Sequence, residues 1–212
     1  MDETARQTTL MTALTTEHFV LQTAASSTIA EASARSSLYM LSLSSSLIAL
    51  GFTSQLPDVF LPFASAVIPA VFLLGLFTVM RLVDTSLENM QYLTGIARIR
   101  SYYRSLGPEA AVHFSANTGR WPEAVKSTPA LRLGRWLAFL GTTASMIAVT
   151  NSILAGVGVT ILAKNLLDKT HGWLAILIGI ASAVLLTVAF LVYQRWRFRQ
   201  FDGSEAQGSE PG

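Results

Sequence analysis

The chain has 212 residues, of which 51% are hydrophobic and 13% are charged, whereas ordinary soluble domains carry about 25% charged residues. So few charges cannot cover a water-soluble globule, and the apolar residues fall in long blocks, which is typical of an integral membrane protein. A formal net charge of +2 is no signature of a nucleic-acid-binding protein, and the absence of cysteine excludes disulfides and thiolate metal sites.

Residues 1–37 predict a cytoplasmic amphipathic helix. Leu10, Leu14 and Leu21 recur at helical spacing, and neither proline nor glycine interrupts residues 4–50. We therefore expect one long helix that begins in the cytoplasm and continues into the first membrane span. The acidic start of the chain differs from the basic start of a cleavable signal peptide, so none is expected.

Residues 38–80 predict transmembrane helices 1 and 2. The first span, at about 38–52, is the weakest because several serines interrupt it, but each hydroxyl can bond to a carbonyl four residues earlier. The second span runs from about 59 to 80. Pro69 lies inside this span, where we expect it to kink the helix.

Residues 81–135 predict a cytoplasmic helix and loop. The second span has no helix breaker after it until Gly107 and Pro108, so the helix is expected to continue to about residue 106. The rest of this region is polar and rich in breakers. It predicts a loop in which a short helix could form around residues 123–126.

Residues 136–194 predict transmembrane helices 3 and 4, at about 136–163 and 173–193. Trp136, Trp173 and Tyr193 stand at span ends, where aromatic rings form interfacial belts. Residues 195–212 predict a basic cytoplasmic flank, followed by a disordered tail after Phe201.

The basic residues predict the orientation of the four spans. Thirteen of the 15 lysines and arginines lie in the two terminal segments or the central region, and only Lys164 and Lys169 lie in the predicted outer loops. The positive-inside rule then places both termini and the central loop in the cytoplasm. We expect a multi-pass protein of the cell inner (plasma) membrane.

The sequence carries no pattern that indicates catalysis. His18, His113 and His171 fall on three different segments, so no two are expected to share a metal site, and no hydrolase, metalloprotease or phosphate-loop motif occurs. The interiors of the spans hold no charged residue or histidine, which membrane enzymes and proton-coupled transporters retain for function. We expect no enzyme activity, no cofactor and no metal.

One side of the first span is lined by small and hydroxyl-bearing residues, which makes it a candidate pore face: Ser42, Ser45, Ser46 and Ala49, widened by Ser37 and Ser44. Hydroxyls that face a common axis could line a water-filled path through an oligomer. The alternative is that these serines pack between helices of the same chain.

Small residues also recur every four positions in the third and fourth spans, as Ala148, Ser152 and Gly156 and as Ala175, Gly179 and Ala183. Such ridges let helix backbones approach closely. They predict either packing within the chain or a subunit interface.

Asn151 lies in the middle of the third span, where its amide must find a polar partner. An interhelical hydrogen bond is the favoured role, and a ligand site is the alternative.

Three arginines crowd the end of the second long helix: Arg98, Arg100 and Arg104, beside Tyr102 and Tyr103. A juxtamembrane basic cluster usually meets anionic lipid. Arginine with aromatic rings could instead hold a phosphate and stack on a base.

The segment 31–52, EASARSSLYMLSLSSSLIALGF, leads from an amphipathic helix through Glu31 and Arg35 into a small-residue-rich span. With the short turn, second span and long helix that follow, residues 15–105 resemble the start of small bacterial membrane effectors of the Pycsar and SLATT type. The resemblance implies a membrane part that oligomerises and compromises the inner membrane in antiphage defence. It places Arg35 and the Ser42 to Ser46 face at the start of that part.

Together these features predict an all-α fold, a four-helix membrane bundle whose first two transmembrane helices extend into the cytoplasm as a stalk. The expected function is a homo-oligomeric pore-forming or membrane-perturbing effector or ion channel. The alternative is a non-conducting membrane scaffold whose cytoplasmic helices bind a partner protein. The lipid bilayer and further copies of the chain are the expected partners, and nucleic acid is not.

Overall fold

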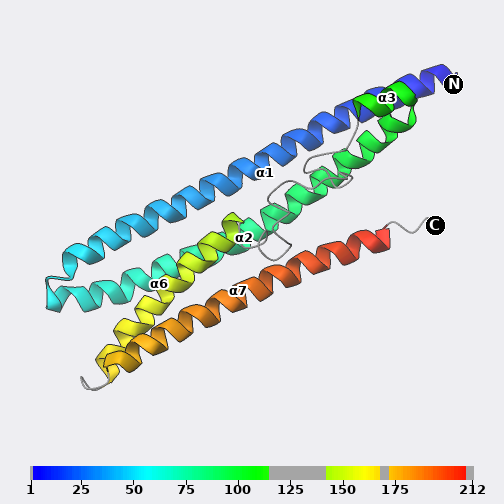
Figure 1. Cartoon of the computed structure of the whole chain (residues 1–212). Helices are drawn as coiled ribbons and strands as arrows, with labels where there is room; N and C mark the ends of the chain where they lie inside the picture. Colours follow the sequence, from blue (N-terminus) through cyan, green and yellow to red (C-terminus); the bar gives the residue numbers. More distant parts are fainter. Residues whose placement is uncertain (1, 115–141, 168–171, 209–212) are drawn as a thin grey trace. The chain divides into compact units, whose positions relative to one another are not determined.

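The computed structural model describes residues 2–114, 142–167 and 172–208, with side chains up to residue 200. These ranges form α1 (Glu3–Thr53), α2 (Pro57–Ser105), α3 (Pro108–His113), α6 (Thr143–Leu166) and α7 (Gly172–Gly208) (Figure 1). Every regular element in the described ranges is helical, which agrees with the all-α prediction. The chain divides into two compact units, and each is described by itself: unit 1 is Met1–Ala32 with Thr85–Phe139, and unit 2 is Ser33–Asp84 with Leu140–Gly212.

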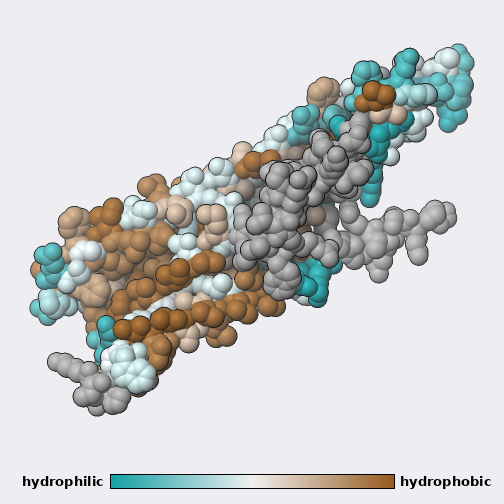
Figure 2. Space-filling view, viewed as in Figure 1, coloured by the Kyte–Doolittle hydropathy of each residue, from teal (hydrophilic) through white to brown (hydrophobic). Residues whose placement is uncertain are grey.

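Four of the helices are long and apolar enough to cross a membrane. They are α1, α2, α6 and α7, and α1 is the least apolar of them, because its span carries the serines. On the visible face of unit 2, apolar side chains cover α6 and α7 (Figure 2). The chain is therefore a multi-pass membrane protein with four candidate transmembrane helices, as predicted.

The length of α1 follows from its composition. Its first 48 residues contain neither glycine nor proline, and several of its threonine hydroxyls donate to carbonyls of the helix itself. Thr8 donates to the Thr4 carbonyl at 2.9 Å, and Thr12 donates to the Thr8 carbonyl at the same distance. Such bonds satisfy a hydroxyl without a partner from another helix, so a threonine-rich segment remains helical up to the first span.

The second long helix ends as predicted, but a short helix follows that was not predicted. Ser105 ends α2, and α3 then begins at Pro108 with Glu109 in its first turn. Proline at the first helical position and an acidic residue beside it are both helix-start signals. The prediction of a loop from residue 107 was therefore wrong for the six residues of α3.

The limits of the last two helices also differ from the predicted spans. Thr142 caps α6, because its side chain accepts a hydrogen bond from the Ser145 backbone N–H at 3.2 Å. Residues 136–141 of the predicted third span, and the predicted helix at 123–126, lie outside the described residues. α7 continues to Gly208, beyond Phe201, after which the sequence predicted a disordered tail.

Unit 1 contains the N-terminal part of α1, the C-terminal part of α2, and α3. Leu21 lies against Gly95, where a Cβ atom would come within 2.9 Å of a Leu21 methyl carbon. Thr28 donates a hydrogen bond to Asn89 Oδ1 at 3.3 Å. The contact of Leu21 with Gly95 and the hydrogen bond from Thr28 to Asn89 both join α1 to α2 in this unit.

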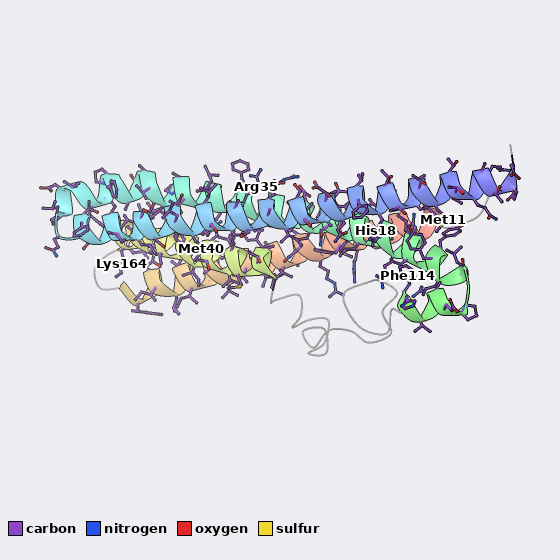
Figure 3. The ribbon with its side chains drawn as sticks, turned by 90° about the horizontal axis from the view of Figure 1, so that it is seen from above. Met11, His18, Arg35, Met40, Phe114 and Lys164 are labelled. Carbon is purple, nitrogen blue, oxygen red and sulfur yellow. The ribbon has the colours of Figure 1, made fainter. Side chains whose placement is uncertain are left out.

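Unit 2 contains the remaining parts of α1 and α2 together with α6 and α7, and its helices pack as pairs. The end of α1 and the start of α2 lie at the same end of the unit as the end of α6 and the start of α7 (Figure 1). Lys164, near the end of α6, lies toward that end (Figure 3). Two antiparallel helix pairs are the arrangement expected for a four-span protein.

Candidate functional site

The residues of the candidate pore face of α1 point in different directions. Ser45 is exposed, whereas Ser42, Ser46 and Ala49 are half-buried. The three half-buried residues flank the buried side chains of Tyr39 and Leu43, which face the other helices of unit 2. Their role as pore-lining residues stays a prediction.

A different set of hydroxyls on α1 faces outward. Ser37 and Ser44 are exposed, and they stand seven residues apart, which puts them on the same face of a helix. Leu41 and Ile48 lie on this face as well, and they are 66% and 61% exposed. We call Ser37, Ser44 and Ser45 the outer serine face of α1.

A buried polar cluster joins α1, α2 and α6 inside unit 2. The Asn151 Nδ2 atom donates to the backbone carbonyl of Phe72 at 3.1 Å, and the Tyr39 hydroxyl donates to Asn151 Oδ1 at 3.3 Å. Asn151 and Tyr39 are both fully buried. The amide therefore holds three helices together, which is the interhelical role that its position predicted.

Gly75 makes room for this cluster. A Cβ atom at this position would lie 2.2 Å from Asn151 Oδ1 and 2.7 Å from Tyr39 Cε2. Atoms cannot approach so closely, so only glycine fits here while both side chains keep their places. Gly75 and Tyr39 were not predicted as site residues, because the spacing of residues along the chain does not reveal the partner of either.

The small residues of the third and fourth spans meet each other inside the chain. A Cβ atom added to Gly156 would lie 2.6 Å from the Gly179 carbonyl oxygen and 2.9 Å from Ala183 Cβ. Ala148, Ser152 and Ala175 are buried as well. The structure therefore uses these ridges for packing α6 against α7, and a subunit interface made by the same residues stays a prediction.

A second polar cluster joins α6 and α7 near the start of α6. Ser145 Oγ donates to Gln194 Oε1 at 3.1 Å, and Gln194 Nε2 donates to Thr142 Oγ1 at 3.2 Å. Gln194 is only 3% exposed. The amide of Gln194 thus uses both its acceptor and its donor on the residues that cap α6.

An ion pair joins α2 and α7 at the same end of α7. Arg197 donates to Asp84 Oδ1 at 2.5 Å, and the two side chains are about one-third exposed. Asp84 and Arg197 were predicted to lie on separate cytoplasmic segments, and their contact was not predicted.

The three arginines predicted to bind anionic lipid or a ligand do not form one cluster. A helix turns by about 100° per residue, so Arg98 lies about 160° from Arg100 and about 120° from Arg104 around α2. Arg98 is exposed, whereas Arg100 and Arg104 are half-buried. A single ligand could therefore meet Arg100 and Arg104 together, but not all three.

No metal site is found among the residues that the structure describes, since no group of three His, Cys, Asp or Glu side chains there could hold an ion. His18 and His113 belong to unit 1, and His171 lies outside the described residues. The His18 Nδ1 atom is buried and has no hydrogen-bond partner within the described part.

Comparisons of the chain with protein-family models, with curated proteins and with solved structures found no match. The chemistry and geometry of its own residues are therefore what support a function.

Proposed function

We propose that this chain forms a homo-oligomer in the bacterial inner membrane and opens a pore or otherwise perturbs the bilayer, with α1 against a neighbouring copy. The observation that carries the proposal is the exposure of the outer serine face, which begins at Ser37, next to the predicted first span, and continues inside that span with Ser44 and Ser45. Ser37, Ser44 and Ser45 point away from the buried contacts of their own chain. They lie on the least apolar of the four candidate spans.

Small hydroxyl-bearing residues favour close contact between membrane helices, because they let the backbones approach. In a single chain, the outer serine face would meet lipid tails, which make no favourable polar contact with the hydroxyls. In an oligomer, the same face would meet α1 of another copy, and hydroxyls gathered round a common axis can replace part of the water shell of an ion. The half-buried Ser42, Ser46 and Ala49 would border this path.

The proposal includes the orientation with both termini in the cytoplasm. Lys164 lies toward the end of unit 2 where α1 ends and α2 begins (Figure 3), whereas Arg195, Arg197 and Arg199 follow the apolar part of α7 at its other end. This asymmetry supports the orientation through the positive-inside rule. The proposal includes no catalytic step.

The test is the conductance of the purified chain in a planar bilayer, with its oligomeric state measured in the same detergent. We expect discrete conductance steps from an oligomer, and we expect Ser44→Leu with Ser45→Leu to abolish them by making the outer serine face apolar. Ser65→Leu is the matched control, because Ser65 is an exposed serine in the span of α2. Unchanged steps in the double variant, or a silent bilayer with the native chain, would contradict the proposal.

A second function is favoured by exposed apolar side chains in unit 1. Phe19, Val20 and Ile29 of α1 are 63%, 56% and 58% exposed, on a segment predicted to lie in the cytoplasm. Such residues favour a non-conducting scaffold that binds a partner protein there. In that case Phe19→Ser with Val20→Ser abolishes partner binding, whereas Ser44→Leu with Ser45→Leu leaves partner binding unchanged.

A further inference from the structure

Unit 1 carries two exposed side chains of opposite charge, Glu17 on α1 and Arg98 on α2. Neither has a hydrogen bond or an ion pair with another residue in the described part of the chain. Both charges are therefore available to a molecule outside the chain.

The contacts between α1 and α2 place Glu17 and Arg98 at the same level. Leu21 of α1 lies against Gly95 of α2, and the two helices run antiparallel. Glu17 precedes Leu21 by four residues, and Arg98 follows Gly95 by three, so the two steps run in the same direction, over about 6 Å and about 4.5 Å. The levels of the two charges thus differ by about 1.5 Å.

Helix geometry also places the two charges on the same side of the helix pair. At about 100° per residue, Glu17 is turned about 40° from Leu21, and Arg98 is turned about 60° from Gly95 in the same rotational sense. In an antiparallel pair, turns of the same sense lead to the same side. This side of unit 1 therefore has an acidic group on α1 and a basic group on α2 at one level.

The neighbours of the two charges complete a face in which large and small residues alternate. We call six residues the docking face of unit 1: Ala13, Glu17 and Val20 on α1, and Gly95, Arg98 and Tyr102 on α2. Tyr102 and Val20 are 39% and 56% exposed. By the same helical steps, Ala13 lies at the level of Tyr102, and Gly95 lies at the level of Val20. Each large side chain thus has a small residue at its level on the other helix.

We propose that the docking face binds the docking face of a second copy of this chain, which is related to the first by a two-fold axis parallel to the helices. Such a rotation sets α1 of each copy against α2 of the other, so a face with an acid on one helix and a base on the other is complementary to itself. Glu17 of each copy then forms an ion pair with Arg98 of the other, and each large side chain meets a small residue. The inference rests on the part of the proposed function that makes the chain a homo-oligomer with one orientation, and it uses no residue of the outer serine face.

The experiment measures the association of the full chain in phosphatidylcholine vesicles by energy transfer between donor-labelled and acceptor-labelled copies. The chain has no cysteine, so Thr4→Cys, at an exposed position, carries the label. An exposed ion pair is worth about a factor of two in an association constant, and a like-charge pair costs about the same. Because two copies make two such contacts, Glu17→Arg and Arg98→Glu should each weaken association about 15-fold.

A mixture of the two variants separates contacts between copies from contacts within one chain. A Glu17→Arg copy beside an Arg98→Glu copy has opposite charges at both contacts, so the mixture should associate within about two-fold of the native chain. Glu3→Arg is the matched control, because it makes the same change of charge at an exposed position of α1. Its level lies beyond the end of α2 at Ser105, so it should associate like the native chain.

Equal losses in Glu17→Arg and Glu3→Arg would overturn the proposal, because association would then respond to net charge alone. A mixture that fails to associate, with recovery in a chain that carries both substitutions, would overturn it as well, since the ion pair would then lie within one chain. An oligomer that neither substitution weakens would overturn this proposal alone and would leave the docking face to a different protein. A native chain that is monomeric in the vesicles would overturn the proposed function with it. Circular dichroism checks that each variant remains helical.

Discussion

Replacing Gly75 by alanine should destabilise unit 2, because the new methyl group has no space. It would lie 2.2 Å from Asn151 Oδ1, 2.4 Å from Asn151 Cγ and 2.7 Å from Tyr39 Cε2. Both of these side chains are fully buried, so neither can turn aside into solvent or lipid. The variant must therefore separate the helices or break the polar cluster.

The expected loss in the free energy of unfolding is the sum of three contributions. Forcing an extra methyl group into a packed interior costs about 1–3 kcal/mol. The two hydrogen bonds of Asn151 are worth roughly 0.6 kcal/mol each between membrane helices, and alanine returns about 1 kcal/mol through its higher helix propensity. We expect a net loss of about 1–3 kcal/mol in the free energy of unfolding.

The assay is equilibrium unfolding in mixed micelles, followed by far-ultraviolet circular dichroism during titration with a denaturing detergent. Gly51→Ala is the matched control, because a Cβ atom there would meet nothing within 4 Å. This control should be as stable as the native chain or slightly more stable. A Gly75→Ala protein that behaves like the control would refute the reasoning.

A double-variant cycle locates the cause of the loss. Asn151→Ala removes the two closest atoms, so Gly75→Ala should cost clearly less in that background, although the contact with Tyr39 remains. An equal cost in both backgrounds would mean that Asn151 is not the residue that alanine displaces.

Two further predictions concern the contacts of α6 and α7. Gly179→Ala should lower the free energy of unfolding by about 1–3 kcal/mol, because its methyl group would meet Thr160 Oγ1 and the Gly156 backbone oxygen, which cannot move aside. Gly158→Ala would meet one side chain, that of Ile68, and no backbone atom within 4 Å, so it should cost less; the reverse order would contradict the close backbone approach. Asp84→Asn should lower the free energy of unfolding by less than about 1 kcal/mol, because Arg197 and Asp84 are 34% and 37% exposed. This loss should become smaller in about 1 M salt. A loss that salt leaves unchanged would mean that Asp84 stabilises the fold through packing and not through its charge.

Much of the fold could be predicted because single long helices depend on local composition. The absence of glycine and proline from residues 4–50 was enough to predict α1 as one helix, and the apolar blocks were enough for the four spans. The miss was α3, although Gly107, Pro108 and Glu109 carry the helix-start signal. The breakers were interpreted as the end of one helix and not also as the beginning of another.

Less of the candidate site could be predicted, because its contacts depend on how distant helices are aligned. Asn151 was predicted to form an interhelical hydrogen bond because it is an amide inside a span, but its partner Tyr39 is separated from it by more than a hundred positions in the sequence. Gln194 was placed at the end of the region 136–194 that holds the last two spans, and Asp84 in the cytoplasmic region 81–135. No periodicity relates such residues until the helices are placed beside one another.

The partner that Asn151 uses on α2 is a main-chain oxygen, and this has a consequence for evolution. Any residue at position 72 supplies the same carbonyl, so substitutions there can accumulate without a matching change at position 151. Variation among homologues should therefore show no covariation between these two positions, although they touch. The selective constraint should appear at Gly75, whose lack of a side chain permits the contact, and at Tyr39, whose hydroxyl completes it.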